Sequence, residues 1–105
     1  MEGLLPIGSV VFLTGSERRV MIIGVLQIQE KDGEKVLWDY SGVLYPDGYF
    51  GPNKTFLFND EQIEKVFFVG FQDEEQFAFK TKVDSIRKEF REGATIDYVD
   101  ADEEE

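Results

Sequence analysis

The chain has 105 residues, of which 42% are hydrophobic and 14% aromatic, enough material for one domain built around one core. Its 22 acidic and 11 basic residues give a formal net charge of −11, so we expect no binding to nucleic-acid phosphates or to anionic membranes. The absence of Cys and His excludes disulfides, thiolate metal sites and the commonest general base, and we expect neither a membrane-spanning helix nor a secretory signal.

Three apolar, β-branched runs open the sequence and predict three strands, at 10–13, 20–29 and 36–44. Asp32-Gly33 lies between the second and third runs and is a strong signal for a tight hairpin turn. Short turns between consecutive strands predict an antiparallel meander.

A segment rich in proline and glycine follows at 45–53 and predicts an ordered aromatic loop without regular structure. Asn59 to Gln62 has the pattern of a capping box and predicts one or two helical turns that end near Lys65. The run 66–71 is apolar throughout, which predicts a fourth strand in the interior of the sheet.

Asp73 to Gln76 repeats the capping pattern and predicts the start of one long helix, with Gly93 as its C-terminal stop. One apolar stripe at helical spacing is predicted to pack on the core, and it consists of Phe79, Val83, Ile86 and Phe90. The other face is predicted to be solvated, and it carries Lys80, Asp84, Arg87, Lys88 and Arg91.

These elements predict a single α+β domain at 1–93, with a curved, four-stranded, mainly antiparallel sheet and a C-terminal helix. The pattern leaves open whether the sheet is open or closes into an SH3-like small barrel. Residues 94–105 are predicted to be a disordered acidic tail, since the last nine residues carry six acids and no Lys or Arg.

Catalytic chemistry has little support in the residue types present. The serines have no His to activate them, and a pair of carboxylates is the one remaining route, to a small hydrolase. Asp97, Asp100 and Asp102 alternate but do not form an EF-hand, and 48–51 lacks the Lys-Ser/Thr of a phosphate loop. We therefore predict a protein that is not an enzyme and has no cofactor and no metal.

The aromatic residues near the middle of the chain are the best candidates for a partner-binding surface, because Tyr and Trp are favoured at protein interfaces. These candidates are Tyr45, Tyr49 and Phe50, followed by Trp38 and Tyr40. The alternative is that Trp38 and Tyr40 belong to the core of the third strand.

Four segments occur in an order that resembles a small bacterial family, long labelled only as a domain of unknown function, and they are 4–11, 20–24, 39–49 and 58–71. That family is found in Gram-positive bacteria beside LXG-type toxin genes of type VII secretion. The resemblance implies a cytoplasmic accessory protein, a chaperone or targeting factor that binds a cognate LXG toxin before export. It implies no catalytic residues.

Two other functions compete with this one. An immunity protein that inhibits a cognate toxin also suits a small acidic chain, because charge complementarity to a basic enzyme speeds association. A carboxylate-based hydrolase is the third possibility. The partner could also bind by adding a strand to an exposed sheet edge.

Overall fold

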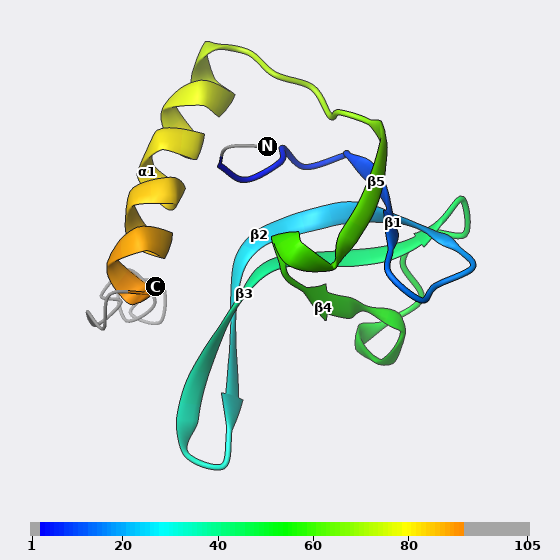
Figure 1. Cartoon of the computed structure of the whole chain (residues 1–105), viewed down its shortest axis with the longest axis horizontal. Coiled ribbons are helices and arrows are strands. Elements are labelled where there is room, and N and C mark those ends of the chain that lie inside the picture. Colours follow the sequence, from blue (N-terminus) through cyan, green and yellow to red (C-terminus); the bar gives the residue numbers. More distant parts are fainter. Residues whose placement is uncertain (1–2, 92–105) are drawn as a thin grey trace.

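The computed structural model describes residues 3–91, so the predicted domain end, helix stop and tail lie outside the described residues. The described chain forms five strands, one long helix and two short 3-10 helices (Figure 1). Their bounds are β1 Val10–Leu13, β2 Arg19–Lys31, β3 Glu34–Tyr45, η1 Pro52–Lys54, β4 Phe56–Phe58, η2 Asp60–Gln62, β5 Ile63–Phe68 and α1 Glu74–Arg91.

The strands form one antiparallel sheet in the order β4-β3-β2-β1-β5. The prediction of an α+β chain with a mainly antiparallel sheet is confirmed, but the prediction of four strands is wrong. The additional strand, β4, has only three residues and follows a Pro/Gly-rich loop, so it is too short to show an alternating pattern.

The last strand was also predicted in the wrong place within the sheet. Within residues 3–91, β5 is an edge strand that pairs only with β1, although its run of apolar residues is typical of an interior strand. Both Phe67 and Phe68 are exposed on it. The apolar residues of β5 therefore form an exposed hydrophobic surface, and the strand is not buried on both faces.

The β2–β3 hairpin is the longest ladder of the fold and confirms the predicted turn. Asp32 and Gly33 both have positive φ, 53° and 82°, and connect the paired residues Lys31 and Glu34. The register shifts between Ile22 and Gly24, and the tip of the hairpin projects from the rest of the molecule (Figure 1).

A thin layer of irregular chain separates the helix from the sheet. The segment before β1 runs between α1 and the sheet (Figure 1), and two of its amide groups are held from opposite sides. The Leu4 N–H donates to Asp84 Oδ1 of α1 at 3.1 Å, and the Leu5 N–H donates to the Tyr40 hydroxyl of β3 at 2.9 Å. Leu4 and Leu5 are therefore core residues that connect the two layers.

The helix begins as predicted, but its apolar stripe is buried only in part. Asp73 caps it by accepting a hydrogen bond from the Gln76 N–H at 2.9 Å. Val83 is buried, whereas Phe79 is 50% exposed. The prediction of a solvated opposite face is wrong for Arg87, which turns toward the sheet to meet a buried carboxylate.

Candidate partner-binding groove

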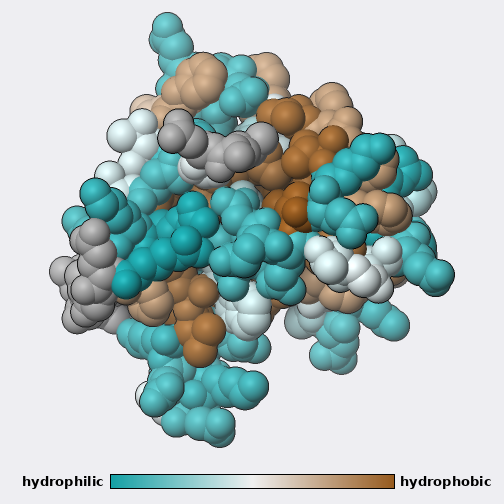
Figure 2. Space-filling view, viewed as in Figure 1, coloured by the Kyte–Doolittle hydropathy of each residue, from teal (hydrophilic) through white to brown (hydrophobic). Residues whose placement is uncertain are grey.

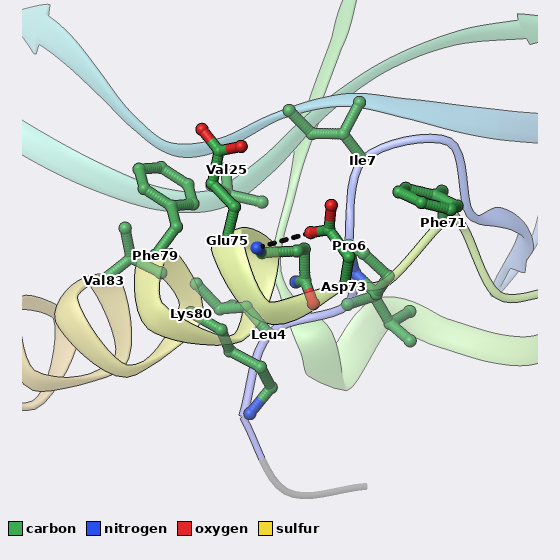
Figure 3. A pocket seen from close by; sticks show the side chains of 12 residues that line it. Leu4, Pro6, Ile7, Val25, Phe71, Asp73, Glu75, Phe79, Lys80 and Val83 are labelled. Carbon is green, nitrogen blue, oxygen red and sulfur yellow. Dashed lines mark hydrogen bonds between the residues drawn. The ribbon is translucent and has the colours of Figure 1, made fainter.

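An open groove of about 500 Å³ lies between the segment before β1 and the first half of α1 (Figure 3). Phe79 and Phe71 lie toward opposite ends of the groove, and Ile7 and Val25 lie between them (Figure 3). The remaining lining residues are Leu4, Leu5, Pro6, Asp73, Glu75, Gln76, Lys80 and Val83.

The groove is surrounded by large apolar side chains that the fold leaves accessible. Phe71 is 78% exposed and Ile7 is 54% exposed. Hydrophobic residues gather over the part of the molecule where the segment before β1 approaches β5 (Figure 2). A contiguous exposed apolar surface of this kind is typical of an interaction site.

The polar groups of the groove are acidic or lack a partner. In the described part of the chain, Asp73 and Glu75 form no ion pair with Lys or Arg. Lys80 is neutralised by Asp84, with Nζ 2.9 Å from Oδ2. The side-chain oxygen of Gln76, Oε1, is buried and has no hydrogen-bond partner among residues 3–91. The groove can therefore accept a hydrogen bond and attract a cation.

A buried ion cluster fixes the position of α1 and so shapes the groove. The Asp39 carboxylate is 1% exposed and accepts hydrogen bonds from Arg87 Nε at 2.9 Å and from the Asp60 N–H at 2.8 Å. Arg91 lies 3.3 Å from the same carboxylate. Burial lowers the pKa of Arg87, but the neighbouring Asp39 outweighs this effect and leaves the pKa raised.

The floor of the groove depends on a buried phenol. The Tyr40 hydroxyl accepts the Leu5 N–H and donates to the Asp60 carboxylate. Burial, followed by the hydrogen bond to Asp60, raises the pKa of Tyr40 well above its ordinary value. Tyr40 therefore remains protonated and keeps the segment before β1 in place at physiological pH.

The structure does not bring the five predicted aromatic residues together. Tyr40 is fully buried against Phe58, with ring centroids 5.4 Å apart, and belongs to the core. Trp38 is half-buried on the hairpin, where its Nε1 donates to Gln29 Oε1 at 3.0 Å. Tyr45 lies seven residues further along β3, a distance of roughly 23 Å along a strand.

The three remaining candidates lie at the end of β3 and in the loop that follows it, and they differ in exposure. Tyr45 is partly covered by Arg19, whose guanidinium carbon lies 5.1 Å from the ring centroid. Tyr49 and Phe50 are 62% and 71% exposed. They are accessible to a partner, and their role in partner binding stays a prediction.

Sequence patterns did not identify the groove. The pattern assigned Phe79 to the core because its spacing matches Val83, and it assigned Phe71 to an interior strand. Residues 66–79 contain more apolar side chains than one edge strand and one face of a helix can bury. This excess was the available signal for an exposed apolar surface. Gln76 gave no signal, since its unpartnered oxygen depends on tertiary packing.

Two features are absent from residues 3–91. No group of three His, Cys, Asp or Glu side chains is placed to hold a metal ion in this range. No helix in the same range has the length and apolar character needed to cross a membrane.

Comparison with known proteins gives one match. Neither a curated protein nor a solved structure matches the chain. A family model described as a domain of unknown function (DUF4176) matches residues 4–79, which include the whole sheet and most residues of the groove. Because this match covers well over half of the 105 residues, the protein belongs to the DUF4176 family.

Proposed function

We propose that the protein is a non-enzymatic, cytoplasmic chaperone or targeting factor that binds a cognate LXG-type toxin for type VII secretion. The observation that carries the binding role is the open apolar groove, with Phe71 and Phe79 left accessible beside unpaired acidic groups. The identity of the partner rests on the resemblance of the sequence to proteins encoded beside such toxins.

Burial of the exposed side chains supplies a driving force for such binding. Removing about 100 Å² of apolar area per aromatic residue from water contributes about 2.5 kcal/mol at about 25 cal/mol per Å². Two or three such residues contribute about 5–7.5 kcal/mol before ordering costs, so micromolar association, at about 8 kcal/mol net, also requires further apolar and polar contacts. Moderate affinity suits a chaperone, because its cargo must also dissociate before export.

The test is co-expression of the protein with an LXG-type toxin, followed by affinity purification and a direct assay of toxin activity. We expect a complex in which the toxin remains active, and reduced toxin level or export in cells that lack the protein. Capture of an inactive toxin at one-to-one stoichiometry would instead support an immunity protein. Normal toxin accumulation and export without the protein would contradict the chaperone role.

We also propose that the curved sheet is an SH3-like small barrel. The strand order, the register shift in β2 and the 3-10 helix between β4 and β5 support this assignment. An experimental structure in which β2 does not curl across both halves of the sheet would contradict it.

A further inference from the structure

We propose that the groove between the segment before β1 and α1 binds a basic amphipathic helix of the partner. Its apolar side chains would pack between Phe71 and Phe79, Gln76 would turn to offer its buried Oε1 to one donor, and Lys or Arg would approach Asp73 and Glu75. This inference rests on the proposed function and deepens it, because it names the binding site and the chemistry of the bound segment.

The geometry of the groove favours a helix over an extended strand. One wall consists of side chains of α1, and the other of side chains from irregular chain whose Leu4 and Leu5 amides are already used. These two amides cannot pair with a bound strand, and the interior backbone groups of α1 are bonded within the helix. A helix satisfies its own backbone and presents apolar side chains on one face.

The size of the apolar surface favours a polypeptide over a small molecule. Small-molecule sites enclose most of their ligand, whereas this groove is open and its hydrophobic surroundings continue outward. Ile7 is 54% exposed and Phe71 is 78% exposed. An occupant that covers both must extend along the groove and beyond it.

The polar groups define the sign of the partner's charge. Asp73 and Glu75 have no basic partner in residues 3–91, and the nearby Lys80 is neutralised by Asp84. The whole chain carries −11, so its field favours a cationic segment from a distance as well as in contact. An acidic helix of the same shape would be repelled.

Gln76 supplies a position-specific contact beside the apolar residues of the groove. A buried carbonyl oxygen without a donor costs free energy, and a bound donor removes that cost. A segment that places an amide, hydroxyl or guanidinium N–H or O–H there is preferred over one that places a methyl group. Gln76 is thus a specificity-determining residue of the groove.

The decisive probe is a pair of synthetic 18-residue helical peptides with identical Leu and Phe anchors on one face. One peptide carries Lys and Arg on its polar face, and the other carries Glu at the same positions. We expect the basic peptide to shift the amide NMR signals of Phe71, Gln76 and Phe79 in the full-length protein, more weakly at high salt. The acidic peptide should leave these signals in place.

Matched substitutions distinguish residues that line the groove from nearby residues that do not. Phe79→Ser should weaken binding of the basic peptide about tenfold or more. Phe77→Ser is the control, because Phe77 is 52% exposed on the same helix but does not line the groove. Gln76→Leu should reduce the difference in affinity between peptides with and without a donor at the central position. Gln72→Leu should preserve it, because Gln72 is exposed and does not line the groove.

Several results would contradict the assignment of the binding site to the groove. Signal shifts confined to β5 or to the loop at Tyr49 and Phe50, equal binding of both peptides, or no binding would each overturn the groove assignment. Equal losses for Phe79→Ser and Phe77→Ser would do the same. None of these results depends on capture of a toxin, so failure of this inference and failure of the proposed function can be distinguished.

Discussion

Asp39 brings a full negative charge into the interior of a small domain, at the point where β3, η2 and α1 meet. The two arginines that reach it come from one face of the helix, one turn apart. A buried charge is tolerated only where partners replace the lost water. The cluster therefore determines the position of α1 more specifically than the apolar contacts of Val83 do.

Replacing Asp39 with Asn should destabilise the fold by about 3–5 kcal/mol, because Arg87 and Arg91 would lose their shared buried carboxylate and Arg87 would keep only Asp60 at 3.3 Å. Urea unfolding with an unchanged m-value measures this loss. Asp47→Asn is the matched control, since Asp47 pairs with Arg18 on the surface and should cost less than about 1 kcal/mol. Similar losses for the two variants would contradict the role of Asp39.

Tyr40 should make the stability depend on alkaline pH. Its pKa is raised in the folded state above the ordinary value of about 10, so the stability that it contributes is complete below about pH 10. As pH rises further toward the folded pKa, that contribution is lost at up to about 1.4 kcal/mol per pH unit.

Tyr40→Phe should cost about 1–3 kcal/mol near pH 8, because the Leu5 N–H and the Asp60 carboxylate lose their partner. Urea unfolding of both proteins between pH 8 and pH 11 checks the prediction. The difference between wild type and variant should narrow above about pH 10, while a constant difference across this range would show that Tyr40 does not titrate with unfolding.

At the scale of elements, the sequence predicted what depends on local chemistry. The bounds of the first strand, the Asp32-Gly33 turn and the cap at Asp73 are confirmed because each depends on neighbouring residues. The edge position of β5, the burial of Asp39 and the exposure of Phe79 depend on residues far along the chain. The spacing of apolar residues along one strand or helix does not reveal contacts with such distant residues.

The groove illustrates the same limit. Its composition was visible as apolar residues at 66–79, but its existence depends on the irregular segment that lies between α1 and the sheet. No periodicity marks that segment, because its Leu4 and Leu5 are placed by single hydrogen bonds to Asp84 and Tyr40. The sequence therefore supported a binding role without locating the site.

A close backbone contact joins the end of β5 to this segment. The Gly70 N–H donates to Ser9 Oγ at 2.9 Å, and a Cβ atom at Gly70 would lie 2.1 Å from the Ile7 carbonyl oxygen. Gly70→Ala should therefore destabilise the protein by about 1–3 kcal/mol or more. It should also alter the groove, because Ile7 lines it.

Thermal and urea unfolding measure the cost of Gly70→Ala, and Gly15→Ala provides the comparison. Gly15 has open space around its Cβ position but a φ of 83°, so its substitution costs only the backbone strain of about 1–2 kcal/mol. If Gly70→Ala were the milder of the two, the contact with Ile7 would not be a tight one.

At the scale of the whole molecule, the charge of −11 governs how a partner approaches. The ion cluster at Asp39 is internal and contributes little at long range, whereas acids on the surface and near the C-terminus act over about 8 Å at physiological ionic strength. Such a field changes association rates more than it changes dissociation rates.

Converting the six C-terminal acids to amides would change the net charge from −11 to −5, and these acids are Asp97, Asp100, Asp102, Glu103, Glu104 and Glu105. With a basic partner segment, association at low salt should slow about tenfold or more, while dissociation changes little. Unfolding free energy should stay within about 0.5 kcal/mol of wild type, because these residues follow the last described element of the fold.

Stopped-flow association with the basic peptide at low and at physiological salt measures the effect. Equal association rates for wild type and variant at low salt would show that the tail does not steer the partner, and would leave the electrostatic contribution to the other acids, which include Asp73 and Glu75 in the groove.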